Sequence, residues 1–84
     1  MISIYLKILN LVYNNINDIN SLKNTKIEKL EILSLFGNKI SDISVLEKVN
    51  YPNLKQLWLF NNDINNISYL KNTKFENLEI FIFR

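Results

Sequence analysis

The sequence predicts an α/β solenoid, a right-handed coil with a parallel concave β-sheet and short 3₁₀ or α turns on the convex side. Three observations lead to this fold. Leucine recurs every 24 residues, at Leu6, Leu30, Leu54 and Leu78. Each of these leucines begins an alternating apolar segment, which is typical of a strand with one buried face. Fifteen of the 84 residues are Asn and none is Ala, which disfavours a helical bundle.

The whole chain, 1–84, is predicted to form one domain of stacked units. The first unit begins LKILNLVYNNI, the second LEILSLFGNKI and the third LKQLWLFNNDI, whereas the fourth is only LEIFIFR. The repeats therefore span 6–29, 30–53, 54–77 and a partial 78–84, with an incomplete N-terminal flank at 1–5. Each unit of this kind buries its apolar face only against its neighbours, so the units must stack.

The predicted elements follow the same order in every unit. A strand comes first and directs the leucines three and five residues after its start into the core. An Asn then turns the chain, because its side chain can bond the backbone groups of a tight bend. These structural turns are at Asn14, Asn38 and Asn62. Apolar residues spaced by three follow, as in Ile16, Ile19 and Leu22, and predict a short 3₁₀ or α turn on the convex side.

The pattern L-x-x-L-x-L-x-x-N-x-L, repeated over residues 6–84, resembles the leucine-rich repeat family. The run N-x-I-x-x-I-x-x-L after each strand is similar to the subclass found in phosphatase-regulating and internalin-like proteins. The resemblance implies a leucine-rich repeat solenoid that acts as a non-catalytic protein–protein interaction module. Its partner would be a protein or peptide held on the concave face.

Strand residues that alternate with the core leucines are expected to lie on the concave face. Many of them are apolar, although outward positions on a solvated sheet are usually polar. The candidate partner-binding residues are Trp58, Phe60, Phe36, Tyr13, Ile8, Ile32 and Val12. Two other interpretations stay open. Parallel strands favour β-branched and aromatic residues on either face, and an apolar face can also drive self-association.

The fourth unit has strand residues Phe81 and Phe83 but neither an Asn turn nor an outer segment. A strand without a cap is a template for pairing with another chain. We therefore expect marginal stability and self-association through this strand. The alternative function is that the chain is a fragment or truncated copy of a longer leucine-rich repeat protein, with a purely structural role in repeat stacking. A short strand that simply ends the stack also stays open.

The composition argues against several other classes of function. Cys and His are absent, which removes thiolate and imidazole metal sites and nucleophilic catalysis by Cys or a His base. We expect no enzyme activity and no cofactor. A net charge of +2 does not indicate nucleic-acid binding, and no apolar run reaches the ~20 residues of a membrane span.

Charged and polar residues fit structural roles. Lys7, Glu31, Lys55 and Glu79 fall in one column, which predicts cross-strand pairing. Asp18 and Asp42 align at the outer turn and are expected to accept backbone amides. We expect a cytoplasmic location, because Lys7 interrupts the apolar start and no small-residue cleavage site follows. The surplus of Asn and of Lys over Arg suggests AT-rich coding DNA.

Overall fold

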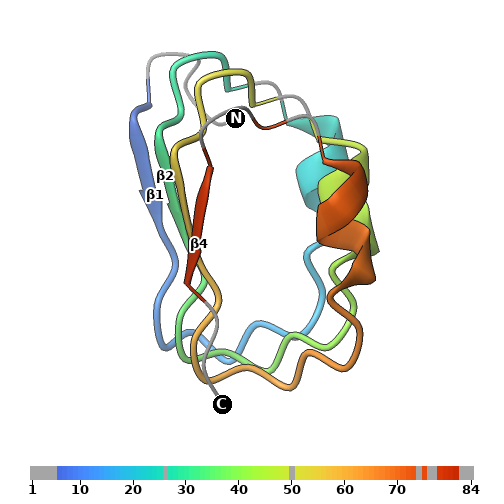
Figure 1. Cartoon of the computed structure of the whole chain (residues 1–84). Helices are drawn as coiled ribbons and strands as arrows, with labels where there is room; N and C mark the ends of the chain where they lie inside the picture. The colour runs from blue at the N-terminus through green and yellow to red at the C-terminus, as the bar shows by residue number, and fades with distance from the viewer. Residues whose placement is uncertain (1–5, 26, 50, 74, 76–77, 82–84) are drawn as a thin grey trace.

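A computed structural model shows four strands on one side of the molecule and three 3₁₀ helices on the other (Figure 1). It describes residues 6–25, 27–49, 51–73, 75 and 78–81. The predicted flank at 1–5 and the end of the partial unit, including Phe83, lie outside the described residues. We call residues 6–29, 30–53 and 54–77 coils 1, 2 and 3. The predicted α/β solenoid with a parallel sheet and short 3₁₀ turns is confirmed.

Each coil contributes one three-residue strand and one 3₁₀ helix, and the partial unit adds a fourth strand. The strands are β1 (Ile8–Asn10), β2 (Ile32–Ser34), β3 (Gln56–Trp58) and β4 (Glu79–Phe81). The 3₁₀ helices are η1 (Asn20–Asn24), η2 (Ser44–Glu47) and η3 (Ser68–Asn72). The strands pair in parallel in the order β1-β2-β3-β4, so neighbours in the sequence are also neighbours in the sheet.

The register of the sheet follows the sequence repeat up to β3. Ile8 pairs with Ile32 and Ile32 pairs with Gln56, each 24 residues further along the chain. The repeat predicts Ile80 opposite Gln56, but the residue found there is Glu79. The N–H of Glu79 nevertheless donates to the Lys55 carbonyl at 2.8 Å, just as the N–H of Lys55 donates to the Glu31 carbonyl at 2.8 Å. The pairing of β4 with β3 is therefore offset by one residue, while the first backbone bond of β4 keeps the spacing of the repeat.

The core lies between the sheet and the 3₁₀ helices, and coil 2 is its best-covered layer. Coils 1 and 3 cover the two faces of coil 2, which is why almost all of its repeat residues are buried. Burying apolar side chains is the main force that holds such a stack together. The fully buried side chains are Ile27, Leu30, Leu33, Leu35, Ile40, Ile43, Leu46, Tyr51, Leu54, Leu57 and Leu59.

The outer face of coil 3 is far less covered. Ile67 is 58% exposed, whereas Ile43 of coil 2 is 0% exposed and Ile19 of coil 1 is 4% exposed. Ile64, Leu70 and Phe75 are only partly buried against the core. The same repeat positions therefore change from core to surface at coil 3.

Side-chain oxygens begin each outer turn. Asp18 Oδ1 accepts the N–H of Asn20 at 2.8 Å, and Asp42 Oδ1 accepts the N–H of Ser44 at 2.9 Å. The expectation that these two Asp residues accept backbone amides is confirmed. In coil 3 the oxygen comes from Asn66, which accepts the N–H of Ser68 at 2.9 Å. The N–H and hydroxyl of Ser44 lower the pKa of Asp42 below its ordinary value.

A buried tyrosine links coils 1 and 2 on the convex side. Tyr51 is 1% exposed, and its hydroxyl lies 2.7 Å from Thr25 Oγ1. Thr25 donates its own hydroxyl hydrogen to the Leu22 carbonyl at 2.6 Å, so the Tyr51 hydroxyl is the donor in the pair. Thr73 in coil 3 makes the same local bond as Thr25, because its hydroxyl donates to the Leu70 carbonyl at 2.9 Å.

A Tyr51→Phe chain is expected to lose about 1 kcal/mol of unfolding free energy, because the hydrogen bond to Thr25 disappears while the ring stays packed. Burial raises the pKa of Tyr51 above its ordinary value of 10.0, partly offset by Thr25. The folded state therefore retains the proton longer than the unfolded state. Stability contributed by Tyr51 is full below pH ~10 and is lost as the pH rises through the folded pKa.

Urea unfolding at neutral and alkaline pH measures both effects. The alkaline loss of stability should be smaller in Tyr51→Phe than in the wild type. Tyr13→Phe is the matched control, because the Tyr13 side chain is 68% exposed. Equal alkaline losses in the Tyr51→Phe and wild-type chains would contradict the assignment.

Candidate partner-binding surface

The strands and the residues just after them form one face of the sheet that points away from the core. Leu33, Leu35, Leu57 and Leu59 are buried, so the residues between them point to the concave side. The backbone ladder continues past the strand ends, because the N–H of Tyr13 donates to the Phe36 carbonyl at 3.0 Å. The N–H of Gly37 likewise donates to the Phe60 carbonyl at 2.8 Å. These bonds hold the aromatic residues of adjacent coils side by side.

Four aromatic rings form a continuous chain of contacts on this face. We call Tyr13, Phe36, Phe60 and Trp58 the aromatic ladder. The ring centroids of Tyr13 and Phe36 are 5.1 Å apart, and those of Phe36 and Phe60 are 5.7 Å apart. Trp58 and Phe60 are separated by 5.5 Å, and all three pairs are edge-to-face. This is the preferred aromatic geometry, so the rings fix one another's orientation.

The indole of Trp58 is held by its own strand. Its Nε1–H donates to Gln56 Oε1 at 3.0 Å, and both side chains are half-buried. Gln56 and Trp58 are two residues apart on β3 and therefore share a face. The bond engages the indole N–H of Trp58 within the chain.

The left-handed backbone at the end of each strand positions the first ring. Tyr13, Gly37 and Asn61 occupy equivalent positions in coils 1, 2 and 3, with φ of 54°, 72° and 54°. A side chain at Gly37 would meet the Tyr13 ring, because a Cβ atom there would lie 2.6 Å from two ring carbons. The Tyr13 ring therefore lies against Gly37 Cα.

The aliphatic candidates extend the apolar face toward the beginning of the strands. Ile8 is 54% exposed, whereas Ile32 and Val12 are half-buried. Ile8 pairs with Ile32 across β1 and β2, so these two side chains are neighbours. Val12 follows β1 at the position equivalent to Phe36 and Phe60. The structure thus brings all seven sequence-predicted candidates onto one sheet.

Below this face, the Asn turns bind the coils to one another. Asn38 is 6% exposed, and its Oδ1 accepts the N–H groups of Asn14 and Ile16 at 2.9 and 3.0 Å. Its Nδ2 donates to the carbonyls of Leu11 and Leu35, both at 2.9 Å. The side chain therefore joins coil 2 to coil 1 directly beneath the aromatic ladder.

Asn62 repeats this bonding between coils 3 and 2. Its Oδ1 accepts the N–H of Ile40 at 3.0 Å, and its Nδ2 donates to the Leu35 carbonyl at 2.8 Å. Asn14 differs because it is exposed and its side chain donates to Val12 within its own coil at 3.0 Å. Of the three Asn turn residues, Asn38 and Asn62 are therefore the two whose side chains connect successive described coils.

The charged column at the start of the strands has a structural role. Lys55 Nζ lies 3.5 Å from Glu31 Oε1, as cross-strand pairing predicts. Both side chains are solvent-accessible, so the pair contributes little to stability. Lys7, Lys29, Asn53 and this pair line a hollow of about 250 Å³. Within the described residues, His, Cys, Asp and Glu form no group of three that could hold a metal ion.

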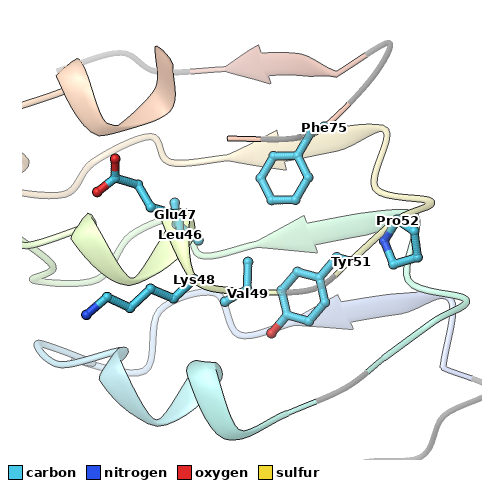
Figure 2. A pocket seen from close by; sticks show the side chains of 7 residues that line it. All are labelled: Leu46, Glu47, Lys48, Val49, Tyr51, Pro52 and Phe75. Carbon is cyan, nitrogen blue, oxygen red and sulfur yellow. The ribbon is translucent and has the colours of Figure 1, made fainter. Parts of the chain in front are cut away.

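A pocket that the sequence pattern does not predict lies on the convex side. It has a volume of about 380 Å³ and lies between η2 and the chain around Phe75. Figure 2 shows the rings of Tyr51 and Phe75 on one part of its wall and the charged ends of Glu47 and Lys48 at another. Tyr51 and Phe75 are equivalent repeat positions, so the pocket lies between two successive coils. It lies on the opposite side of the molecule from the aromatic ladder.

Comparison with known proteins agrees with this architecture. The family described as Leucine Rich repeats (2 copies) has a model that matches residues 28–72, more than half of the chain. A search of curated proteins found no match. None of the helices in the described part of the chain has the length and apolar character to cross a membrane. The predicted subclass stays a prediction. The matched segment contains β2, β3 and all of η2 and η3, and the chain belongs to the leucine-rich repeat family.

Proposed function

We propose that the chain is a non-catalytic interaction module that binds a protein or peptide partner on its concave face. Leucine-rich repeat domains generally mediate protein–protein interaction. The aromatic ladder is the observation that supports the concave face as the binding surface. Its rings lie on a rigid sheet, and their mutual contacts leave little conformational freedom to lose on binding.

The composition of this face fits binding energetics. Trp and Tyr are the residues most enriched among binding hot spots, and a large aromatic side chain buries about 150–250 Å² when covered. Tyr13 is already 68% exposed and lies beside Phe36. A contiguous exposed apolar patch on a soluble domain usually marks an interaction site. A partner that covers the ladder would gain its energy mainly from the four rings.

Replacing both Trp58 and Phe60 by Ser is expected to reduce partner capture by roughly tenfold or more, because two neighbouring rings of the ladder are removed. Capture is measured with the immobilised full chain and a lysate of the source cells. Far-UV circular dichroism checks the fold. Ile67→Ser is the matched control, because it removes an exposed aliphatic side chain from the uncovered face of coil 3 and leaves the aromatic ladder intact.

Equal capture by the wild type and the double variant would reject the concave face as the binding surface. If the Ser pair fails to fold, Trp58→Leu with Phe60→Leu retains apolar cover and still removes the rings. A photoreactive benzoylphenylalanine at Phe36 provides an independent measurement. It should cross-link the partner, whereas the same group at Ile67 should not.

A second function, repeat stacking, is supported by the outer face of coil 3. Ile67, Leu70 and Phe75 hold positions that are buried in coil 2, yet they are exposed or only half-buried in coil 3. Thr73 also donates its hydroxyl to the carbonyl three residues before it, as Thr25 does. In coil 1, Thr25 accepts a hydrogen bond from the Tyr51 hydroxyl of the next coil. Under this alternative, the face is covered by a further coil or a second copy of the chain.

An Ile67→Glu substitution separates this alternative from partner binding. If coil 3 drives association, the wild type sediments as more than a monomer, and Ile67→Glu shifts it toward the monomer by burying a charge at the contact. Partner capture through the concave face should remain unchanged. A wild-type chain that stays monomeric over a wide range of concentrations would exclude self-association by this face.

A further inference from the structure

In coils 1 and 2, the isoleucine two residues after the Asn turn is bound through its backbone by the next coil. The N–H of Ile16 in coil 1 donates to Asn38 Oδ1 at 3.0 Å. The N–H of Ile40 in coil 2 donates to Asn62 Oδ1, also at 3.0 Å. The carbonyls of these two isoleucines accept backbone N–H groups of the following coil at 2.8 and 2.9 Å. The following coil therefore bonds both backbone groups of one residue.

Ile64 has the same position in coil 3 but lacks these bonds. Among the described residues, none accepts its N–H and none donates to its carbonyl. The residue is half-buried, whereas Ile40 is 0% exposed. A partly buried backbone group is satisfied either by a partner or by water. Coil 3 thus offers a donor and an acceptor at the place where coils 1 and 2 are bonded by a following coil.

A second contact between successive coils pairs side chains of like polarity. Thr25 of coil 1 and Tyr51 of coil 2 share a hydrogen bond between their hydroxyls at 2.7 Å. The equivalent residues of coils 2 and 3 are Val49 and Phe75, which both line the convex pocket. A hydroxyl is therefore matched to a hydroxyl at one junction, and an apolar side chain to an apolar ring at the next. Such matching avoids a buried polar group without a partner.

Thr73 continues the row of Thr25 and Val49 into coil 3. Its hydroxyl donates to the Leu70 carbonyl at 2.9 Å, so its hydrogen is used and its oxygen keeps the capacity to accept. No described residue donates to Thr73 Oγ1. The same local bond leaves Thr25 Oγ1 able to accept the phenol of the next coil. The side chain that matches Thr73 is therefore a phenol rather than an apolar ring.

Apolar side chains accompany these two polar positions on the outer face of coil 3. Ile67 is 58% exposed, and Leu70 and Phe75 are only partly buried. A purely apolar ligand would cover these side chains and leave both polar positions without a partner, which costs free energy. An occupant that fits must therefore combine apolar cover with one acceptor for Ile64 and one donor for Thr73.

A second copy of the chain matches this face less well. Stacked head to tail, its coil 1 would bring Asn14 to Ile64 but would place Ile27 where the phenol belongs, because Ile27 has the position of Tyr51. The Thr73 hydroxyl would then meet an apolar side chain. The face therefore selects a coil that carries both an Asn and a Tyr.

We propose that the outer face of coil 3 binds a leucine-rich repeat coil of a partner polypeptide with the sequence N-x-I-x-x-I-x-x-L-x-x-x-x-Y. The Asn side chain of that coil accepts the N–H of Ile64, and its Ile and Leu side chains cover Ile67 and Leu70. Its Tyr hydroxyl donates to Thr73 Oγ1. Coil 2 has this sequence from Asn38 to Tyr51. The inference rests on repeat stacking, the second candidate function, and names the partner of that face.

The first test supplies such a coil from the chain's own sequence. One coil cannot bury its apolar face alone, so the probe is attached: a copy of residues 30–81 replaces residues 78–84. Amide hydrogen exchange at Ile64 is then compared with that in the natural chain, with Ile40 as the internal reference. We expect exchange at Ile64 to slow by roughly tenfold or more, because its N–H gains the copied Asn38 as acceptor. Unchanged exchange would overturn the inference.

Variants of the extended chain test the two polar matches separately. Asn38→Ala in the copy should abolish most of the slowing at Ile64. Tyr51→Phe in the copy should speed the exchange by roughly threefold to tenfold, because Thr73 loses its donor. Adding Thr73→Val should then restore much of the slowing, since it recreates the pairing of Val49 with Phe75. An equal rate for the Tyr and Phe copies would overturn the selection of a phenol.

The second test identifies the natural occupant. The full chain with benzoylphenylalanine at Ile67 is irradiated in the source cells, and the peptide cross-linked to it is sequenced. We expect a peptide of another polypeptide that contains the proposed sequence with its Asn and its Tyr. The product should differ from the one obtained at Phe36, because the two positions lie on different faces.

The outcomes separate this inference from the functions proposed above. A cross-link to a second copy of the chain, or to a coil without the Tyr, shows that the inference is wrong while repeat stacking stands. If nothing cross-links at Ile67 and the added coil does not protect Ile64, repeat stacking and the inference both fail. The concave-face function is decided independently by the cross-link at Phe36.

Discussion

Replacing Asn38 by alanine is expected to remove a large part of the unfolding free energy of the chain. The Asn38 side chain is 6% exposed and makes hydrogen bonds to both coils that it joins. Alanine would leave the part-buried N–H groups of Asn14 and Ile16 and the part-buried carbonyl of Leu11 without the Asn38 side chain as their partner, and it would remove the buried bond to the Leu35 carbonyl. A buried backbone group left unpaired costs about 1–3 kcal/mol.

The expected loss of unfolding free energy is large relative to the total stability of a small domain. We expect Asn38→Ala to cost about 3–5 kcal/mol, since several groups lose their partner together. A domain of this size has a total unfolding free energy of about 4–13 kcal/mol, and a short repeat stack lies near the lower limit. Urea unfolding followed by the emission of Trp58 measures the change.

Asn14→Ala provides the matched control. Asn14 has the same place in its repeat, but its side chain is exposed and donates only to Val12 within coil 1. We expect this substitution to cost less than about 1 kcal/mol. Similar losses of unfolding free energy for Asn14→Ala and Asn38→Ala would show that the bonds between coils do not account for the contribution of Asn38 to stability.

The contrast between Asn14 and Asn38 shows what the repeat pattern can predict. The spacing of leucines predicts the strands, their order and the buried positions, because each coil must match the previous one. The pattern also places the Asn turns. It does not distinguish Asn14, Asn38 and Asn62, whereas in the described structure the side chains of Asn38 and Asn62 bond to the coil before them and that of Asn14 bonds within its own coil. That difference comes from stacking and is absent from the local sequence.

The sequence likewise predicts the positions of the candidate surface residues but not their contacts. Alternation along the strands places Trp58, Phe60 and Phe36 on the concave face, but it does not show that their rings touch edge to face. The register of β4 and the convex pocket depend on how two particular coils fit together. The role of Gly37 had a signal in the sequence, since the only glycine of the chain lies at the position equivalent to Tyr13.

Replacing Gly37 by alanine is expected to cost about 2–3 kcal/mol and to displace the first ring of the aromatic ladder. Gly37 has a φ of 72°, and a left-handed backbone costs a residue such as Ala about 1–2 kcal/mol. The new Cβ would lie 2.6 Å from Cδ1 and Cε1 of Tyr13, so the ring must move. Its edge-to-face contact with Phe36, worth about 0.5–1.5 kcal/mol, is then lost.

A double-mutant cycle separates the backbone effect from the ring effect. In a Tyr13→Ala background the obstructing ring is gone, so Gly37→Ala should cost only about 1–2 kcal/mol, the part that comes from the left-handed backbone. A coupling of about 1 kcal/mol between the two positions would then measure the packing of the ring on Gly37. Equal costs in both backgrounds would mean that the ring moves aside freely. The concave face would then lack the fixed first ring that recognition of a rigid ligand requires.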